Sequence, residues 1–295
     1  TGTTRKLGID YETLSELNPR LVYCSITGFG QTGPYRNLPG YDFLVQAMGG
    51  LMSVTGERDG EPGGGPQKVG VALSDILTGL YASNGILAAL HERERSGLGQ
   101  HIDLALLDVT AACLANQATN FLVGNVVPGR LGNAHPNIVP YQSFATADGH
   151  FILAVGNDQQ FSRLCEIVTM PELAEDPAFS TNAARVAHRD SLIAKLSPVF
   201  EEQTSDHWLS ACQARNVPAG PINTIDEVFA DEQVRARDMV VEMSHPENDG
   251  LQLVGNPLKL SRTPVAYERP PPLLGQHNDE VLRRKETSLQ SESRS

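Results

Sequence analysis

The sequence is poor in cysteine, which limits the kinds of site that it can hold. Its 295 residues include four cysteines, Cys24, Cys113, Cys165 and Cys212, which lie far apart and mostly within apolar segments. They show neither the close pairs of a metal site nor the pattern of a disulfide-rich secreted domain. We therefore expect reduced core cysteines, no metal centre and a reducing compartment, either the cytoplasm or, in a eukaryote, the mitochondrial matrix.

Long hydrophobic runs and an excess of basic residues are also missing. No run approaches the ~20 apolar residues needed to cross a bilayer. The 23 Lys and Arg residues are outnumbered by 35 Asp and Glu residues, which gives a net charge of −12. Because non-specific nucleic-acid binding needs a positive surface, we expect neither a nucleic-acid nor a membrane partner. The length predicts two domains or subdomains.

The most informative stretch is KVGVALSDILTGLYASNGILAAL, residues 68–90. Val69, Val71 and Leu73 alternate with small residues, which predicts a short strand, and the apolar residues that follow keep a helical period. Ser74 or Asp75 is expected to cap this helix, where the positive end of the helix dipole favours an ionised carboxylate. Asp75 is then either a nucleophile or only a helix cap.

The chain before this stretch predicts further elements. We expect a helix over 11–17, a strand over 21–26 and a helix over 41–48. The glycine-rich turn GFGQTG between them is not a dinucleotide fingerprint, because Pro34 and a polar loop stand where a helix would have to start. Residues 56–68 form an exposed loop, either a lid over Asp75 or a plain surface insertion.

After the Asp75 helix, a strand is expected over 101–106 and a helix over 107–123, which indicates an α/β domain. The segment GNVVPGRLGNAHPNIVPYQSF that follows is irregular and polar. A loop of this kind can line a pocket, so Arg130, Asn133 and His135 are candidate substrate residues. A lone histidine such as His135 is more often a hydrogen-bonded structural residue.

From Gln142 the pattern predicts a second, smaller α/β unit. Strands over 143–146 and 151–155 flank an Asp-Gly turn, and a late strand pair covers 239–243 and 251–254. The helices are expected over 158–168, 183–202, 205–215 and 225–230. We therefore predict a large domain over 1–140 that holds Asp75, a small α/β domain over 141–254, and an extended C-terminal segment with a polar tail over 255–295.

With these segments in place, the chain resembles the class III CoA-transferases over nearly its whole length. The resemblance rests on several collinear segments: NPRLVYCSITGFGQTGPY, GYDFLVQAMGGLMSVTG, GVALSDILTGLYA, SGLGQHIDLALLD, GNAHPNIVPYQSF, VPAGPINT and PPPLLGQH. GNAHPNIVPYQSF followed by GNDQQF is most similar to the succinate–hydroxymethylglutarate group. The family implies part of a Rossmann-like large domain, a smaller α/β domain and an interlocked homodimer.

The resemblance also implies roles for single residues. Asp75 in GVALSD stands where the family has the aspartate that attacks the acyl-CoA carbonyl. Tyr41 in GYD stands where the transferases have a tyrosine close to the CoA thiol end, and Lys6 in RKLG stands where the family often has a basic residue that meets CoA phosphates. Racemases of the family carry a histidine at the position of Tyr41, and a phenol is a poor base at neutral pH, so racemisation is disfavoured.

The function implied is transfer of CoA from an acyl-CoA to a free carboxylic acid, expected to be a dicarboxylate, through an aspartyl anhydride and thioester. CoA thioester is a co-substrate, and no cofactor is expected to stay bound. Two alternatives remain open: a non-catalytic fragment or oligomerisation partner of this fold, and an enzyme similar to α-methylacyl-CoA racemase.

Two departures from the family bear on these expectations. The chain starts without Met, and the Rossmann-like half that family members carry is expected ahead of Thr1. In the region where formyl-CoA transferase has a glycine-rich loop over its aspartate, this chain has GRLGNAHPN, which disfavours formyl or oxalyl specificity.

Overall fold

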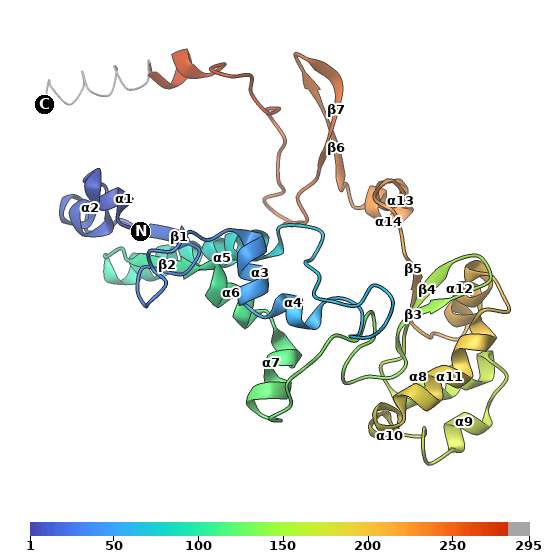
Figure 1. Ribbon diagram of the computed structural model, residues 1–295. Helices are drawn as coiled ribbons and strands as arrows, with labels where there is room; N and C mark the ends of the chain where they lie inside the picture. The colour runs from blue at the N-terminus through green and yellow to red at the C-terminus, as the bar shows by residue number, and fades with distance from the viewer. Residues whose placement is uncertain (283–295) are drawn as a thin grey trace, which may run out of the picture. The chain divides into compact units, whose positions relative to one another are not determined.

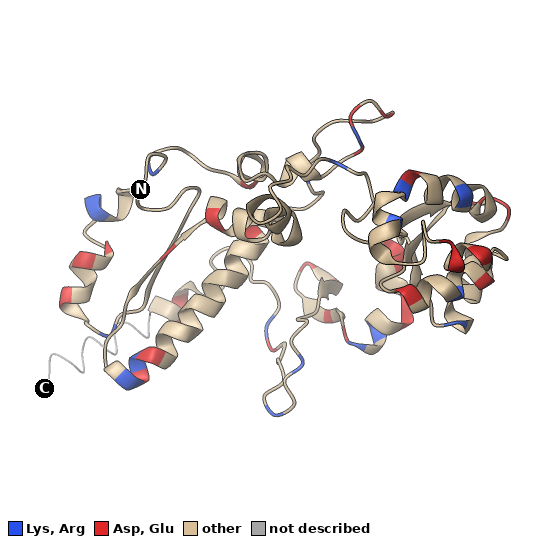
Figure 2. Ribbon diagram, turned by 90° about the horizontal axis from the view of Figure 1, so that it is seen from below, with Lys and Arg blue, Asp and Glu red and all other residues tan. Residues whose placement is uncertain are grey.

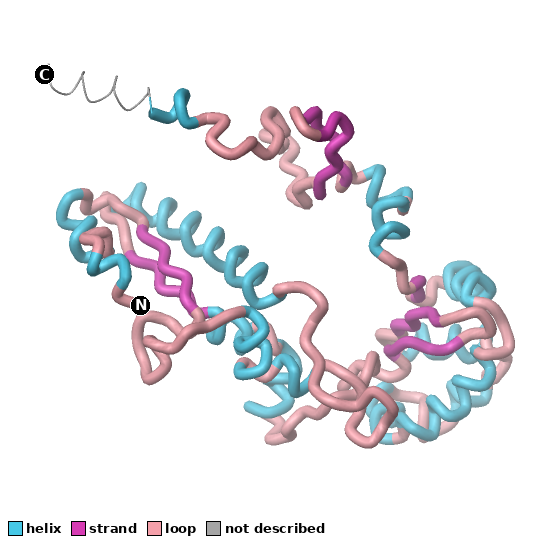
Figure 3. Tube along the Cα trace, turned by 45° about the horizontal axis from the view of Figure 1, so that its top comes forward, coloured by secondary structure: helices cyan, strands magenta, loops and turns pink. Residues whose placement is uncertain are grey.

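The computed structural model describes residues 1–282, which group by their contacts into two units, Thr1–Pro221 and the chain from Ile222 onward. Within these residues the strands form three small sheets, separated along the chain by helices (Figures 1 and 3). The mixed α/β content confirms the predicted class. The strands are β1 (Tyr23–Thr27), β2 (His101–Ala105), β3 (Tyr141–Ala145), β4 (His150–Ala154), β5 (Ala219–Pro221), β6 (Val240–His245) and β7 (Asn248–Val254).

Residues 1–128, which we call the α5 part, are built around the parallel pair β1 and β2. Tyr23 lies opposite His101 and Thr27 opposite Ala105. Parallel strands need a long crossover connection, and here the crossover contains three helices, including the longest in the described chain. The helices of the α5 part are α1 (Thr3–Lys6), α2 (Tyr11–Leu17), α3 (Asp42–Met48), α4 (Leu51–Val54), α5 (Leu73–Ser96), α6 (Leu106–Ala112) and α7 (Ala115–Leu122).

The predicted strand over Val69–Leu73 is wrong, because α5 begins at Leu73 and an irregular segment precedes it. The backbone N–H of Val69 donates to the side chain of Gln46 at 2.9 Å instead of to a neighbouring strand. Alternation of apolar and small residues is the same in both situations, so the pattern alone does not distinguish them.

Two long predicted helices are each broken into two. The helix expected over 107–123 ends at Ala112 and restarts at Ala115, whose φ of 49° is left-handed and incompatible with a continuing right-handed helix. The helix expected over 183–202 is interrupted at His188, whose ψ of 27° is not helical.

The glycine-rich turn after β1 allows two backbone segments to touch. A Cβ atom built on Gly28 would lie 2.6 Å from the Cα of Gly40, and one on Gly40 would lie 2.6 Å from the Cα of Gly28. Only glycine fits at such a close approach. The contact holds the loop next to Tyr41, immediately before α3.

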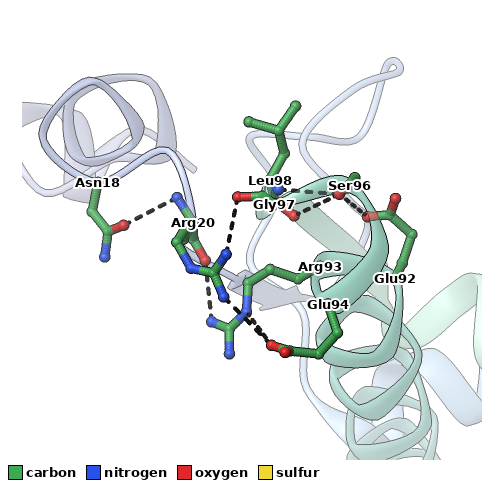
Figure 4. A network of polar contacts seen from close by, with 8 residues as sticks. All are labelled: Asn18, Arg20, Glu92, Arg93, Glu94, Ser96, Gly97 and Leu98. Atoms are coloured by element: carbon green, nitrogen blue, oxygen red, sulfur yellow. Dashed lines mark hydrogen bonds and ion pairs between the residues drawn. The ribbon is translucent and has the colours of Figure 1, made fainter.

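The C-terminal end of α5 is tied to the segment that enters β1 (Figure 4). Gly97 ends the helix with a left-handed φ of 79°, the usual helix-ending conformation for glycine. Arg20 donates to the backbone oxygen of Gly97 at 3.5 Å and pairs with Glu94 at 3.4 Å, while Arg93 donates to the backbone oxygen of Arg20 at 3.2 Å. These contacts fix the axis of α5 against the β1–β2 pair.

Residues 138–221, which we call the β3–β5 part, hold the hydrophobic core of the described chain. The antiparallel sheet has the order β3–β4–β5, and the Asp148-Gly149 turn joins its first two strands as predicted. Phe200 packs against Phe144, Phe151 and Trp208, with ring centroids 4.7–5.2 Å apart. The helices here are α8 (Asp158–Ile167), α9 (Glu172–Glu175), α10 (Asn182–Ala187), α11 (Arg189–Phe200) and α12 (Ser205–Ala214).

A fully buried arginine organises the polar interior of this core. Arg185 donates to the backbone oxygens of Val139 at 2.7 Å and Phe179 at 2.8 Å, and it pairs with Asp158 at 2.8 Å. Its guanidinium also lies 4.3 Å from the ring centroid of Phe161. A buried charge is tolerated when it is paired and hydrogen-bonded in this way.

The cysteine prediction is right for two residues and wrong for one. Cys165 and Cys212 are buried in the core, and burial raises the pKa of their thiols to about 12 and about 11, which leaves them unreactive. Cys113 is exposed, because the helix that was expected to bury it is broken at this point.

The second unit contains a helix pair and a hairpin. Helix α13 (Ile225–Ala230) starts with a capping box between Thr224 and Glu227, and α14 (Glu232–Ala236) follows. Strands β6 and β7 pair from Val240 opposite Val254. The contacts divide the chain after Pro221, whereas the predicted boundaries at 140 and 254 follow sequence pattern and remain predictions. The polar tail beyond residue 282 lies outside the described residues.

Helix α5 meets the length and composition test for a membrane span, with 24 residues and an 18-residue window whose mean hydropathy is 1.2. One such helix is weak evidence, because a packed helix of an ordinary domain passes the same test. Here α5 contacts β1, β2, α3 and α6.

Candidate active site

The first turn of α5 brings Asp75 next to the start of α3. Asp75 is the third residue of α5, and Tyr41 immediately precedes α3. Asp42 Oδ1 accepts hydrogen bonds from the backbone N–H groups of Ser74 at 2.8 Å and Asp75 at 3.3 Å. One carboxylate therefore joins the starts of the two helices.

Asp42 thus performs the capping role that the sequence assigns to Ser74 or Asp75. The residue at the N-cap position of α5 is Ala72, which provides no side-chain hydrogen bond. Helix starts leave backbone N–H groups without partners inside the helix, and Asp42 satisfies two of them from another element. The prediction of a local cap is wrong, and the Asp75 carboxylate is not used in holding its own helix.

Gln46, on the next turn of α3, extends this connection into the interior. Its side chain is fully buried, and its Nε2 donates to Asp42 Oδ2 at 2.6 Å. Its Oε1 accepts from the N–H of Val69 at 2.9 Å. A buried amide needs such partners, and these bonds hold both Asp42 and the segment that leads into α5.

A second buried contact joins α5 to α6. Thr110 Oγ1 lies 2.8 Å from both Ser74 Oγ and the backbone oxygen of Leu106, and Thr78 donates to the backbone oxygen of Ser74 at 2.7 Å. Ser74 and Thr78 have almost no exposed surface. The first turn of α5 is therefore rigidly positioned from two sides.

The Asp75 side chain is exposed to solvent. The residue is exposed, and within residues 1–282 no hydrogen bond or ion pair holds its carboxylate oxygens. It lies in the first turn of a long helix, where the dipole is positive. A fixed backbone with an unengaged, exposed carboxylate has the form that a nucleophile needs.

The two residues predicted to bind CoA lie in different surroundings. Tyr41 is 79% exposed and adjoins Asp42 in the sequence, so its backbone lies beside the two helix starts. Lys6 ends the short helix α1 and is exposed. Among the described residues, no hydrogen bond or ion pair links Lys6 to Tyr41 or Asp75.

The predicted substrate residues Arg130, Asn133 and His135 lie together on the loop before β3. Arg130 pairs with Asp59, and Asn133 donates to Ser143 at 3.1 Å. The Nδ1 atom of His135 accepts from the N–H of Asn137 at 3.1 Å. Burial, and then the charge of Arg189, lower the pKa of His135, so its neutral form is favoured.

This loop borders two adjoining clefts in the first unit. Asn133 lines a cleft of about 650 Å³ with Glu57, Ser143 and Ile193. Arg130 lines a cleft of about 510 Å³ with Arg58 and the start of α11. Asp75 and Tyr41 line neither cleft, and His135 is not among the lining residues of either.

The loop over 56–68 packs against the Arg130 loop. Gly132 donates its N–H to the backbone oxygen of Gly56 at 3.0 Å, and Asp59 pairs with Arg130. Inside the loop, Glu57 and Gly64 form an isolated bridge. These contacts favour a folded insertion over a lid on Asp75.

The residues that the structure describes contain no group of three or more His, Cys, Asp and Glu side chains arranged to hold a metal ion.

Residues 1–278 match the family described as CoA-transferase family III. The chain therefore belongs to this family, as its collinear segments predicted.

The similar proteins include transferases of dicarboxylates. The chain is 52% identical over 282 residues to the succinate–glutarate CoA-transferase of Agrobacterium fabrum, covering 96% of this chain and 70% of that protein. It is 42% identical to the human succinyl-CoA:glutarate CoA-transferase, covering 96% of this chain and 64% of that protein. Its sequence thus spans about two thirds of the length of these relatives.

A solved structure agrees with the fold. The crystal structure of a CaiB/BaiF family protein from Brucella suis superposes with a TM-score of 0.79 at 46% identity, covering 96% of this chain and 72% of that chain. The mixed α/β architecture is therefore that of the family.

Proposed function

We propose that this chain carries the catalytic carboxylate of a CoA-transferase that moves CoA from succinyl-CoA to a second dicarboxylate such as glutarate. The observation that carries the proposal is the family match over residues 1–278 together with an exposed, unengaged Asp75 at the rigid start of α5. The names of the similar transferases support a dicarboxylate as the substrate class.

The first half of the proposed reaction loads CoA onto the protein. The Asp75 carboxylate attacks the thioester carbonyl of succinyl-CoA, the carbon–sulfur bond breaks, and the products are an aspartyl–succinyl anhydride and CoA thiolate. The thiolate then attacks the Asp75 carbonyl carbon, which releases succinate and leaves an aspartyl-CoA thioester. Tyr41, at the same pair of helix starts, is proposed to donate a hydrogen bond to the thiolate.

The second half repeats these steps with the acceptor. A glutarate carboxylate attacks the aspartyl-CoA carbonyl, and thiolate leaves as a second anhydride forms. Attack of the thiolate on the glutaryl carbonyl gives glutaryl-CoA and restores the Asp75 carboxylate. No net proton or electron is needed, and excluding water protects the anhydrides from hydrolysis.

Two further roles are carried over as proposals from the resemblance and from charge. Lys6 is proposed to meet a CoA phosphate, and its exposed cationic side chain supports that role. Arg130, Asn133 and His135 are proposed to line the dicarboxylate pocket, a role supported by the polar clefts beside them. The four free cysteines support a reducing compartment.

We also propose that the protein works as a homodimer of the interlocked family type. The support is an apolar face on α5, where Ile76, Leu80 and Leu87 are 52%, 58% and 65% exposed. Figure 2 shows α5 uncharged over most of its length, with charges gathered at its C-terminal end. Contiguous exposed apolar surface marks an interaction site.

The test of the proposed function replaces Asp75 by Asn in the protein that contains this chain. Formation of glutaryl-CoA from succinyl-CoA and glutarate should fall at least roughly 10³-fold, because the nucleophile is lost. The matched control is Asp206→Asn, an exposed aspartate in the first turn of α12, which should retain full activity. Full activity of Asp75→Asn would refute the assignment, and trapping of a CoA adduct on Asp75 by mass spectrometry would identify the intermediate directly.

A further inference from the structure

Three arginines from distant parts of the sequence line one cleft in the first unit. The cleft of about 510 Å³ is bordered by Arg58 from the 56–68 loop, Arg130 from the loop before β3, and Arg189 at the start of α11. Asp190 is the one carboxylate among its lining residues in the part of the chain that the structure describes. The lining is therefore basic within a chain whose net charge is −12.

Two of these guanidinium groups have donors that nothing in residues 1–282 satisfies. Arg130 Nε and Arg189 Nη1 are shielded from solvent and have no hydrogen-bond acceptor. The other end of the Arg189 guanidinium is held in place, because Nη2 donates to the backbone oxygens of His135 at 2.6 Å and Pro136 at 3.1 Å. An unsatisfied buried donor destabilises the protein, so an added acceptor would be favourable here.

The arrangement also brings like charges together. Burial, followed by the nearby charge of Arg58, lowers the pKa of Arg189, while Asp190 opposes this effect. Helix α11 is 12 residues long and begins at the cleft without a side-chain cap, so its dipole adds further positive potential.

The carboxylates that now pair with the cleft arginines are easily displaced. Asp190 lies 3.4 Å from Arg58, and Asp59 pairs with Arg130, and both aspartate side chains are 84% exposed. The Arg58 side chain is 39% exposed as well, and an ion pair that is exposed on both sides contributes little to stability. A ligand oxyanion that engages several guanidinium groups at once can replace them.

We propose that Arg58, Arg130 and Arg189 form an oxyanion-binding cleft, whose lining includes neither Asp75 nor Tyr41. The ligand class is a carboxylate or phosphate group, which presents several acceptor oxygens to the planar guanidinium forks. Such a group occurs in the dicarboxylate substrates and in the phosphates of CoA. The cleft stands on its own contacts and does not depend on Asp75 being the nucleophile.

The experiment measures binding of inorganic phosphate and of glutarate, in separate titrations, to the protein that contains this chain. Arg58→Gln is the main variant, because within residues 1–282 the Arg58 side chain is held only by its ion pair with the exposed Asp190, so its loss should leave the fold intact. We expect its affinity for the bound anion to fall about 10-fold, the loss of one charge-assisted contact. Arg95→Gln, an exposed arginine on α5, is the matched control and should bind as the wild type does.

A spectroscopic readout follows the unsatisfied donor itself. In protein labelled with ¹⁵N-arginine, the Nε–H signal of Arg130 should shift as the anion is added, and Arg130→Lys identifies that signal by its absence.

Saturation by glutarate alone assigns the cleft to a carboxylate, saturation by phosphate alone assigns it to a phosphate, and competition between the two assigns it to both. The proposal is overturned if neither anion saturates, or if Arg58→Gln binds as tightly as Arg95→Gln. Loss of transfer in Asp75→Asn with anion binding retained would show that anion binding does not depend on the Asp75 carboxylate, so failure of the proposed function and failure of this inference can be told apart.

Discussion

The α5 part and the β3–β5 part differ in the interactions that hold them together. All 17 residues of the buried hydrophobic cluster lie between Val139 and Val217, in the β3–β5 part. The α5 part holds Asp75 and Tyr41, and its helices are positioned mainly by polar contacts such as Asp42 to Ser74. Its apolar side chains are largely exposed. The part that holds the proposed nucleophile is therefore fixed by hydrogen bonds more than by a hydrophobic core.

The largest effect should come from truncating the core. Phe200 has no exposed surface and contacts three aromatic rings, so Phe200→Ala should destabilise the protein by about 3–5 kcal/mol. The matched control Phe43→Ala, on α3, removes a side chain that is 59% exposed and should change stability by at most about 0.5 kcal/mol. Urea denaturation followed by far-UV circular dichroism measures both. Equal losses would contradict the division between the two parts.

The next effect tests whether polar contacts position α5. Asp42→Ala removes the acceptor for the N–H groups of Ser74 and Asp75 and a partner of Gln46. We expect a loss of about 1–2 kcal/mol, the usual range for a helix cap, together with faster hydrogen exchange at the start of α5. Asp42→Asn keeps an acceptor oxygen and should lose less. Unchanged exchange rates in Asp42→Ala would show that packing alone holds the helix.

A smaller effect is expected on the apolar face of α5. Leu80 is 58% exposed, so Leu80→Ala should change the stability of a monomer by at most about 0.5 kcal/mol. If the proposed homodimer covers this face, the same variant should instead weaken association, which sedimentation at several protein concentrations detects. Ser83→Ala, also exposed on α5, is the control. Unaltered association in Leu80→Ala would place the dimer contact elsewhere.

The smallest effect is a pH dependence in the β3–β5 part. The N–H of Ser205 and then the hydroxyl of Thr146 hold the pKa of Asp148 below its ordinary value of 3.8. Asp148 therefore binds a proton more readily in the unfolded state than in the folded state. Its contribution to folding stability is complete above pH 3.8 and is lost as the pH falls through the lower pKa of the folded state. Denaturant midpoints measured down to about pH 3 should fall less steeply in Asp148→Asn than in the wild type. An identical slope would contradict the assignment to Asp148.

The sequence predicted most helices and strands of both parts, but it did not predict the contacts between those elements. The helices at Tyr11–Leu17 and Ile225–Ala230 have the predicted bounds, because apolar period and caps are local signals. Asp42 lies in the GYD motif, but nothing in its own neighbourhood shows that it caps a helix that begins 31 residues later, at Leu73. That contact depends on how α3 and α5 pack, which a single sequence does not show.

The buried polar residues were missed for the same reason. Gln46 and Arg185 are both fully buried, yet each stands in a helix where a polar residue is ordinarily placed on the exposed face. Their partners, Val69 for Gln46 and Val139 for Arg185, are distant in the sequence. The role of Asp75 itself came from the collinear family segments, because its position in α5 is equally that of an ordinary helix residue.

The aromatic core has a consequence for optical experiments on this chain. Trp208 is the only tryptophan in the sequence, and it is buried against Phe200, with its indole N–H donating to the Phe200 backbone oxygen at 2.8 Å. Its fluorescence therefore reports on the β3–β5 part, and we do not expect it to change when a ligand binds near Asp75. A dye or an introduced tryptophan near Tyr41 would be needed to test in real time whether CoA binds at the start of α5.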